Sequence, residues 1–232
     1  MKLHILILIV ALSVAPARLR GSDVSSRVAH CKEGDSKYLV FQPEGTNPMP
    51  ALLLLHGSGD RPSPMIDAWK KLAKKEHLIL IAPELPLDPK FEEAAPAIFR
   101  CDVEDAKQAA PIDARRVYVF GHSMGGYLAY DAATLASEYF AAVAVHAMRI
   151  ADDYAWIADK ATRKTPVAIY IGDRDQFVPL DGARKTRDLL KKSGFSVHYV
   201  ELLGHDHNYY ALADQINSDA WKFLRQAQLP AP

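Results

Sequence analysis

The chain of 232 residues has little cysteine, no excess of either charge and no internal repeat, linker or low-complexity tract. Its only cysteines, Cys31 and Cys101, belong to no Cys-x-x-Cys pair or other metal-ligand spacing. The 28 basic and 28 acidic residues give a formal net charge of zero, which argues against a dedicated nucleic-acid-binding protein. These absences favour an ordinary globular protein, with a single domain expected over residues 18–232.

The first residues have the features of a signal peptide. Lys2 precedes a nearly continuous apolar stretch from Leu3 to Ala15, and Ala15-Pro16-Ala17 fits a small-x-small cleavage site. The apolar stretch of about 13 residues is shorter than the roughly 20 that span a bilayer. We therefore expect a signal peptide over residues 1–17 rather than a membrane anchor. The mature protein is then secreted or periplasmic, without stable membrane insertion.

An exported protein meets oxidising conditions, in which Cys31 and Cys101 can form a disulfide. Such a bond would close a loop of about 70 residues and would stabilise the fold by up to ~4 kcal/mol in the chain-entropy model. Two separate buried thiols are an equal alternative, because the sequence does not show whether the cysteines approach each other. The sequence leaves this pairing open.

Short apolar runs alternate with segments of helical periodicity along the chain. Continuous apolar strands separated by helices are typical of a parallel sheet that is buried on both faces. Strands are expected at Tyr38–Phe41, Ala51–Leu55, Leu78–Ala82, Val117–Phe120, Ala141–Val145, Val167–Ile171 and Val197–Leu202. Helices are expected over Met65–Ala73, 96–110, Tyr127–Ala136, 149–164, Leu180–Lys192 and much of Tyr209–Ala227. Residues 18–36 and 84–95 are expected to be irregular.

The expected strand Val117–Phe120 runs directly into Gly121-His122-Ser123-Met124-Gly125, which fits the G-x-S-x-G pattern of a nucleophile elbow. The pattern places a serine on a sharp strand-to-helix turn, where neighbouring backbones pass so closely that Gly121 and Gly125 must be small. The helix after the turn would aim its N-terminus at Ser123 and favour negative charge there. A plain glycine-rich turn is the alternative. The flanking strand and helix favour the elbow, and Ser123 is the candidate nucleophile.

Ligands bind at the carboxyl ends of the strands in such sheets, and polar residues follow three other strands. His56-Gly57-Ser58-Gly59 follows Leu55, and its turn can offer the backbone N–H of Ser58 to an oxyanion, with the N–H of Met124 as second donor. His56 is interpreted as a brace of this loop rather than as a catalytic base.

The other two strand ends offer a carboxylate and a histidine. Asp173 and Asp175 follow one strand, and His205 and His207 follow the last. A serine hydrolase needs a carboxylate that orients a histidine, and the histidine acts as general base. The order serine, aspartate, histidine is the order of α/β-hydrolases. These residues alone do not choose between the two aspartates or between the two histidines.

Together these motifs resemble the α/β-hydrolase superfamily over about residues 36–227. The resemblance implies a mostly parallel central sheet with helices on both faces. Gly172-Asp-Arg-Asp-Gln-Phe-Val-Pro179 is similar to the family pattern around the acid, which implies Asp175. Asp-His-Asn-Tyr-Tyr over residues 206–210 resembles Asp-His-Ser-Tyr-Tyr of the esterase D and S-formylglutathione hydrolase group, which implies His207 as the base, with Asn208 in place of serine.

The elbow is also similar to those of small carboxylesterases, secreted feruloyl esterases and polyhydroxybutyrate depolymerases. Dienelactone hydrolases resemble the chain in size, but their nucleophile is a cysteine, and Ser123 argues against that chemistry. Many relatives insert a cap where this chain has only His146–Pro166, so we expect a minimal cap, an open site and a preference for short or moderately sized acyl groups. Candidate lining residues, each also explained by core packing, are Tyr154, Trp156, Phe177 and Tyr209.

The sequence therefore predicts a serine esterase that acts on small-molecule esters through a Ser-His-Asp triad and an acyl-enzyme, with no cofactor or metal. A peptidase of the prolyl oligopeptidase type is one alternative, although such domains usually accompany a propeller for which this length has no room. A non-catalytic binding protein on the same fold is the second. A zinc site built from His205, His207, His56 and His122 is the third. The sequence predicts no oligomeric state.

Overall fold

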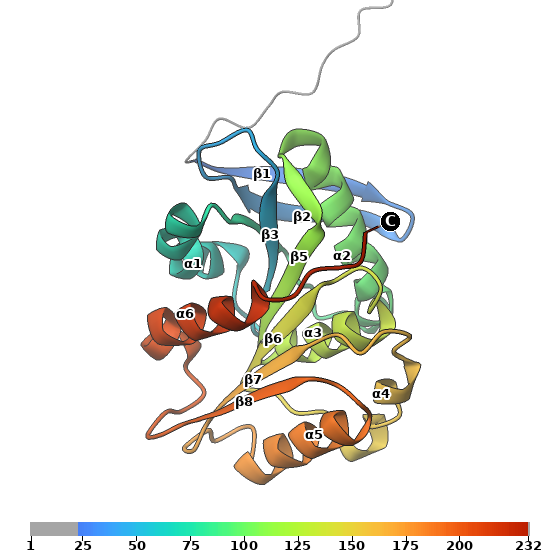
Figure 1. Cartoon of the computed structure of the whole chain (residues 1–232), viewed down its shortest axis with the longest axis vertical. Helices are drawn as coiled ribbons and strands as arrows, with labels where there is room; N and C mark the ends of the chain where they lie inside the picture. The colour runs from blue at the N-terminus through green and yellow to red at the C-terminus, as the bar shows by residue number, and fades with distance from the viewer. Residues whose placement is uncertain (1–22, 232) are drawn as a thin grey trace, which may run out of the picture.

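The structure, a computed structural model, describes residues 23–231. Its strands are β1 (Val24–Cys31), β2 (Gly34–Phe41), β3 (Met49–Leu55), β4 (Ile79–Pro83), β5 (Ile112–His122), β6 (Ala142–His146), β7 (Val167–Gly172) and β8 (Val197–Leu202). They form one eight-stranded sheet in the order β1-β2-β4-β3-β5-β6-β7-β8 (Figure 1). Strands β3 to β8 pair in parallel, whereas β1 and β2 form an antiparallel hairpin at the edge of β4. The expected mostly parallel sheet is confirmed.

Helices cover both faces of this sheet, as predicted (Figure 1). One face carries α1 (Pro62–Glu76) and α6 (Ala213–Leu224). The other face carries α2 (Pro89–Ala109), α3 (Met124–Leu135), α4 (Ile157–Lys160) and α5 (Leu180–Lys192). Short 3-10 turns lie at Asp152–Tyr154 and Tyr209–Leu212. Because helices cover both faces of the sheet, the central strands carry apolar side chains on both sides.

The central strand β3 shows this two-sided burial residue by residue. Leu53 and Leu55 pack in the core beneath α2 and α3, whereas Leu52 and Leu54 pack in the core beneath α1 and α6. Successive side chains of a strand point to opposite faces, so a continuous apolar run fills both cores. Each fully buried leucine contributes about 1.5–3 kcal/mol. The sheet is therefore a rigid support for the loops at its carboxyl edge.

Two expectations about the first half of the chain were wrong. Residues 18–36 were expected to be irregular, but β1 occupies Val24–Cys31. This strand pairs only with β2 and is largely exposed, so its sequence lacks a strong apolar pattern. Helix α2 begins at Pro89 instead of residue 96. Asp88 caps it by accepting the N–H of Lys90 at 3.0 Å, and a proline in the first helical turn needs no N–H partner.

The segment 149–164 was expected to be one helix, and this expectation was also wrong. It contains a 3-10 turn, the four-residue α4 and irregular connections. Ile157 points into the core, but Trp156 is 48% exposed, so no continuous apolar stripe supports a longer helix. Arg163 also holds the end of the segment extended, because its side chain donates to the carbonyl of Ser137 at 2.9 Å. The connection between β6 and β7 therefore contains only short helical segments, in agreement with the expected minimal cap.

A disulfide joins Cys31 at the end of β1 to Cys101 in α2, with 5.8 Å between the two Cα atoms. The structure thus decides the pairing that the sequence left open. The bond fastens the edge hairpin to the helix layer, where β1 has a neighbouring strand on one side only.

The predicted signal peptide, residues 1–17, lies outside the described residues. Over residues 23–231, no helix combines the length and the apolar character needed to cross a membrane.

The disulfide generates a stability prediction. The double substitution Cys31→Ala and Cys101→Ala should lower the free energy of unfolding by about 2–4 kcal/mol, because the unfolded chain regains the conformational freedom of the loop. Guanidinium denaturation measures this change. As a control, a reducing agent should lower the midpoint of the wild-type protein and leave that of the double variant unchanged. Equal denaturation midpoints for the wild-type protein and the double variant, both measured without reducing agent, would contradict the prediction.

Candidate active site

Ser123 lies on the sharp turn between β5 and α3. Its backbone is left-handed, with φ of 53°, which non-glycine residues rarely adopt. A Cβ atom on Gly121 would lie 2.1 Å from the carbonyl oxygen of Gly125, and a Cβ on Gly125 would lie 2.2 Å from that of Leu55. Only glycine fits at both positions. The turn therefore has the geometry that the G-x-S-x-G pattern predicts.

The structure brings Ser123, His207 and Asp175 into one chain of hydrogen bonds. His207 Nε2 lies 2.9 Å from Ser123 Oγ, and His207 Nδ1 lies 2.8 Å from Asp175 Oδ2. The Asp175 side chain is fully buried, and its Oδ1 accepts the backbone N–H groups of Phe177 at 2.9 Å and Val178 at 2.8 Å. These bonds compensate for burial of the carboxylate and hold it against the imidazole.

The other aspartate and the other histidine have different partners. Asp173 Oδ1 accepts the backbone N–H of Gly204 at 2.6 Å, so this carboxylate braces the loop after β8. His205 is buried, and its Nε2 lies 3.1 Å from Nε2 of His146. The chain turns between Leu202 and His207 instead of remaining extended. Side chains two residues apart therefore point in different directions, and only His207 reaches the serine.

The backbone N–H groups of Ser58 and Met124 are the candidate oxyanion donors. Met124 is the first residue of α3, so its N–H has no acceptor within the helix. Ser58 lies in a turn that the N–H of Asp60 closes on the carbonyl of Gly57 at 3.2 Å, which leaves the Ser58 N–H out of the turn bond. The N–H of Gly125 also donates to the carbonyl of His56 at 3.1 Å and joins the two loops.

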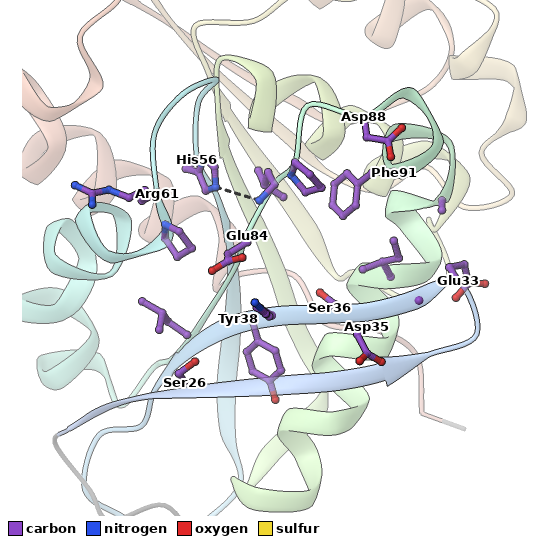
Figure 2. A pocket seen from close by; sticks show the side chains of 18 of the residues that line it. Ser26, Glu33, Asp35, Ser36, Tyr38, His56, Arg61, Glu84, Asp88 and Phe91 are labelled. Atoms are coloured by element: carbon purple, nitrogen blue, oxygen red, sulfur yellow. Dashed lines mark hydrogen bonds between the residues drawn. The ribbon is translucent and has the colours of Figure 1, made fainter.

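His56 has the bonds of a brace. Its Nε2 accepts the backbone N–H of Leu85 at 3.2 Å, so Nδ1 carries the proton and donates to the carbonyl of Gly57 at 2.8 Å. Figure 2 draws a hydrogen bond of His56 as a dashed line, and His56 also lines a larger cavity of about 830 Å³ between the hairpin, α1 and α2. With both nitrogens occupied, His56 is not available as a base for Ser123.

A cavity of about 480 Å³ surrounds Ser123. Of the four aromatic side chains expected around the site, only Phe177 lines it. Phe177 is 69% exposed, and the centre of its ring lies 4.9 Å from that of His207. The full lining comprises Gly57, Ser58, Asp60, His122, Ser123, Met148, Arg149, Phe177, Val178 and His207.

The other three aromatic side chains do not line this cavity. Tyr209 is fully buried in the core, where its hydroxyl donates to Asn217 at 2.6 Å. Tyr154 turns away to donate to the buried Asp131 at 3.0 Å, and its ring packs 5.1 Å from that of Trp156. Core packing therefore explains Tyr209, whereas Trp156 is largely exposed.

Several lining residues were not predicted from the sequence. Asp60 follows β3, and Met148 and Arg149 follow β6, so the rule that ligands bind beyond strand ends would have found them. Asp60 lines both cavities and accepts a hydrogen bond from the Tyr210 hydroxyl.

Burial lowers the pKa of His122 to about 4. The ring beside His207 is therefore neutral at neutral pH.

No three His, Cys, Asp or Glu side chains within residues 23–231 are arranged to hold a metal ion. Of the four histidines considered for zinc, His56 braces the loop after β3, His122 and His205 each bond to His146, and His207 contacts Ser123.

The fold is shared with solved esterases. A thermostable esterase has a TM-score of 0.71 and 20% identity, over 89% of this chain, which spans 63% of that protein. The S-formylglutathione hydrolase from Staphylococcus aureus has a TM-score of 0.72 and 17% identity, over 89% of this chain and 99% of its own. Thermogutta terrifontis esterase 2, phosphorylated by paraoxon, has a TM-score of 0.72 and 16% identity, over 90% of this chain and 97% of its own. These TM-scores establish the α/β-hydrolase fold despite the low identities. No curated protein matches the sequence.

The model of the dienelactone hydrolase family matches residues 68–222, which is more than half of the chain. Ser123, which argued against dienelactone chemistry, lies within the matched residues. The chain therefore belongs to the dienelactone hydrolase family and has the α/β-hydrolase fold.

Proposed function

We propose that this protein hydrolyses small carboxylic esters through Ser123, His207 and Asp175, by way of an acyl-enzyme. The observation that supports the proposal is the unbroken chain of hydrogen bonds from Ser123 Oγ through both nitrogens of His207 to the buried Asp175. This geometry satisfies the requirement for a nucleophile within hydrogen-bond reach of a base that a third group orients.

In the first half of the reaction, Ser123 Oγ attacks the ester carbonyl while His207 Nε2 takes the hydroxyl proton. The carbonyl oxygen becomes an oxyanion, to which the backbone N–H groups of Ser58 and Met124 donate. Asp175 stabilises the imidazolium and keeps Nδ1 protonated. The imidazolium then gives its proton to the departing alcohol as the C–O bond breaks.

In the second half, a water molecule takes the place of the alcohol. His207 removes a proton from that water, which attacks the acyl carbonyl, and the collapse of the second tetrahedral intermediate returns the proton to Ser123 Oγ. The carboxylic acid leaves and the enzyme is restored. The proposed steps use Ser123, His207, Asp175 and two backbone N–H groups, and no metal or cofactor takes part.

The substrate is proposed to carry a short or moderately sized acyl group. The cavity around Ser123 measures about 480 Å³, and the β6–β7 connection contains only a 3-10 turn and one four-residue helix. Turnover of p-nitrophenyl esters of increasing chain length, beside feruloyl and peptide substrates, tests this choice and separates the esterase from the alternative peptidase. Labelling with a fluorophosphonate separates both from a binding protein.

The first functional prediction concerns the nucleophile. Ser123→Ala should lower kcat by on the order of 10⁴ to 10⁶ while the melting temperature stays within a few degrees, because the methyl group fits the elbow and only the attacking oxygen is lost. Ester turnover and thermal unfolding measure the two effects. A variant that retains more than a tenth of the activity would refute the mechanism.

The second prediction separates the paired candidates by their contacts. Asp175→Asn and His207→Gln should each cost about three or more orders of magnitude in kcat, since they remove the orienting group and the base. Asp173→Asn and His205→Gln are the matched controls, and each should stay within about tenfold of the wild-type protein. Assays on one activated ester measure all four. A larger loss at either control than at its partner would reverse that assignment.

We also propose that the protein is exported, on the basis of the apolar N-terminal stretch and its cleavage site. Mass spectrometry of natively expressed protein should then find an N-terminus close to Arg18. An intact Met1 in a soluble cytoplasmic fraction would show that the segment is not a cleaved signal peptide.

A further inference from the structure

Three buried histidines outside the Ser123–His207–Asp175 chain are joined to one another. His122 Nδ1 lies 2.9 Å from His146 Nδ1, and His146 Nε2 lies 3.1 Å from His205 Nε2. The three residues are 8%, 0% and 4% exposed, respectively. Burial of so many polar nitrogens is costly unless they are bonded. The mechanism above makes no use of these side chains.

The strand register explains how the three rings meet. His122 and His146 are the last residues of β5 and β6 and lie opposite each other in the parallel pair. His205 comes from the loop after β8, and its carbonyl accepts the N–H of Arg174 at 2.9 Å, beyond the end of β7. The row of rings therefore joins the strand that precedes the nucleophile to the loop that carries His207.

His146 makes this row behave as a unit. A neutral imidazole has one N–H donor and one acceptor nitrogen, and both nitrogens of His146 are occupied by its two neighbours. If His146 donates to His205, then His122 must donate to His146, and the opposite direction reverses both bonds. Loss of the central ring therefore breaks both bonds at once and leaves a buried nitrogen without its partner on each side.

The row reaches His207 through His122. The ring centres of these two residues are 5.1 Å apart, with planes inclined at 50°. Both nitrogens of His207 are bonded, but a ring held at two atoms can still tilt about the line that joins them. Packing must set that tilt. Of the two rings that contact His207, Phe177 is largely exposed, whereas His122 is buried and held by His146.

The charges around the row are compatible with this role. Burial is the main cause that lowers the pKa of all three rings, and the nearby carboxylates Asp60, Asp175 and Asp206 oppose it for His122 or His205. The rings are therefore neutral near pH 7. A neutral ring beside His207 does not repel the imidazolium that forms there during turnover.

We propose that His122, His146 and His205 form a positioning chain that sets the tilt of the His207 ring toward Ser123. The proposal rests on the proposed function for its catalytic consequence. The three histidines are positioning residues, because their proposed effect is exerted through the ring of His207.

The test begins at the centre of the chain. His146→Phe keeps a ring of similar size and removes both bonds. It should lower kcat for p-nitrophenyl acetate by about ten- to hundredfold with KM within about threefold, because a small misplacement of a catalytic group costs this much. The matched control is His198→Phe, which removes the bond between a β8 histidine and Asp219, away from the cavity. This control should keep kcat within about twofold.

A second pair of variants tests the outer end and does not depend on whether His146→Phe folds. His205→Leu removes the bond to His146 and should lower kcat into the same range. His205→Gln places an amide near the position of Nε2 and should restore most of the loss. The double variant His146→Phe/His205→Leu should lose no more kcat than the more impaired single variant, because both substitutions break the same chain of bonds. Losses that multiply in the double variant would overturn the proposal.

A spectroscopic measurement separates this proposal from the proposed function. The proton shared by Asp175 and His207 should give a low-field proton resonance that shifts or broadens in His146→Phe and stays unchanged in His198→Phe. This resonance can be measured without turnover. If the wild-type protein cleaves no ester, the proposed function is refuted, but the resonance still tests the positioning chain. A folded His146→Phe variant with unchanged kcat and an unchanged resonance would refute the positioning chain.

Discussion

The site depends on the close approach of two backbones at Gly125. A Cβ atom at this position would lie 2.2 Å from the carbonyl oxygen of Leu55, and the Gly125 N–H donates to the carbonyl of His56 at 3.1 Å. This contact fixes the loop after β3 against the first turn of α3. The two proposed oxyanion donors, Ser58 and Met124, lie on these two segments, so their separation is set by backbone packing and not by mobile side chains.

The sheet supplies the rigidity that such a site requires. Ser123, His146, Asp175 and His207 all follow or end parallel strands whose side chains fill the cores on both faces. Because close-packed interiors transmit small displacements, the carboxyl edge holds these groups in fixed relation. The elbow backbone is also tied directly to the next strand, since the N–H of Ser123 donates to the carbonyl of His146 at 3.0 Å. This bond helps to maintain the positive φ of Ser123.

Much of the fold was predictable because its signals are local. All-apolar runs marked β3 to β7, and the G-x-S-x-G turn marked the junction of β5 and α3. The predictions failed where tertiary contacts outweigh local pattern. The exposed edge strand β1 has a weak apolar pattern but is held by β2 and a disulfide. The segment 149–164 has helical residues, yet Arg163 binds the carbonyl of Ser137 beyond the end of α3, and the helix is reduced to α4.

The sequence by itself determined the chemistry on offer: a serine on a strained turn, and aspartates and histidines beyond later strands. These follow from residue identity and from the backbone demands of Gly121 and Gly125. Only the tertiary structure decided which members of the site meet. The turn after β8 sends His205 inward to His146 and His207 outward to Ser123, and Tyr209 enters the core and not the cavity. Such choices depend on the direction of side chains after a turn and on contacts between segments far apart in the chain, neither of which the spacing of residues encodes.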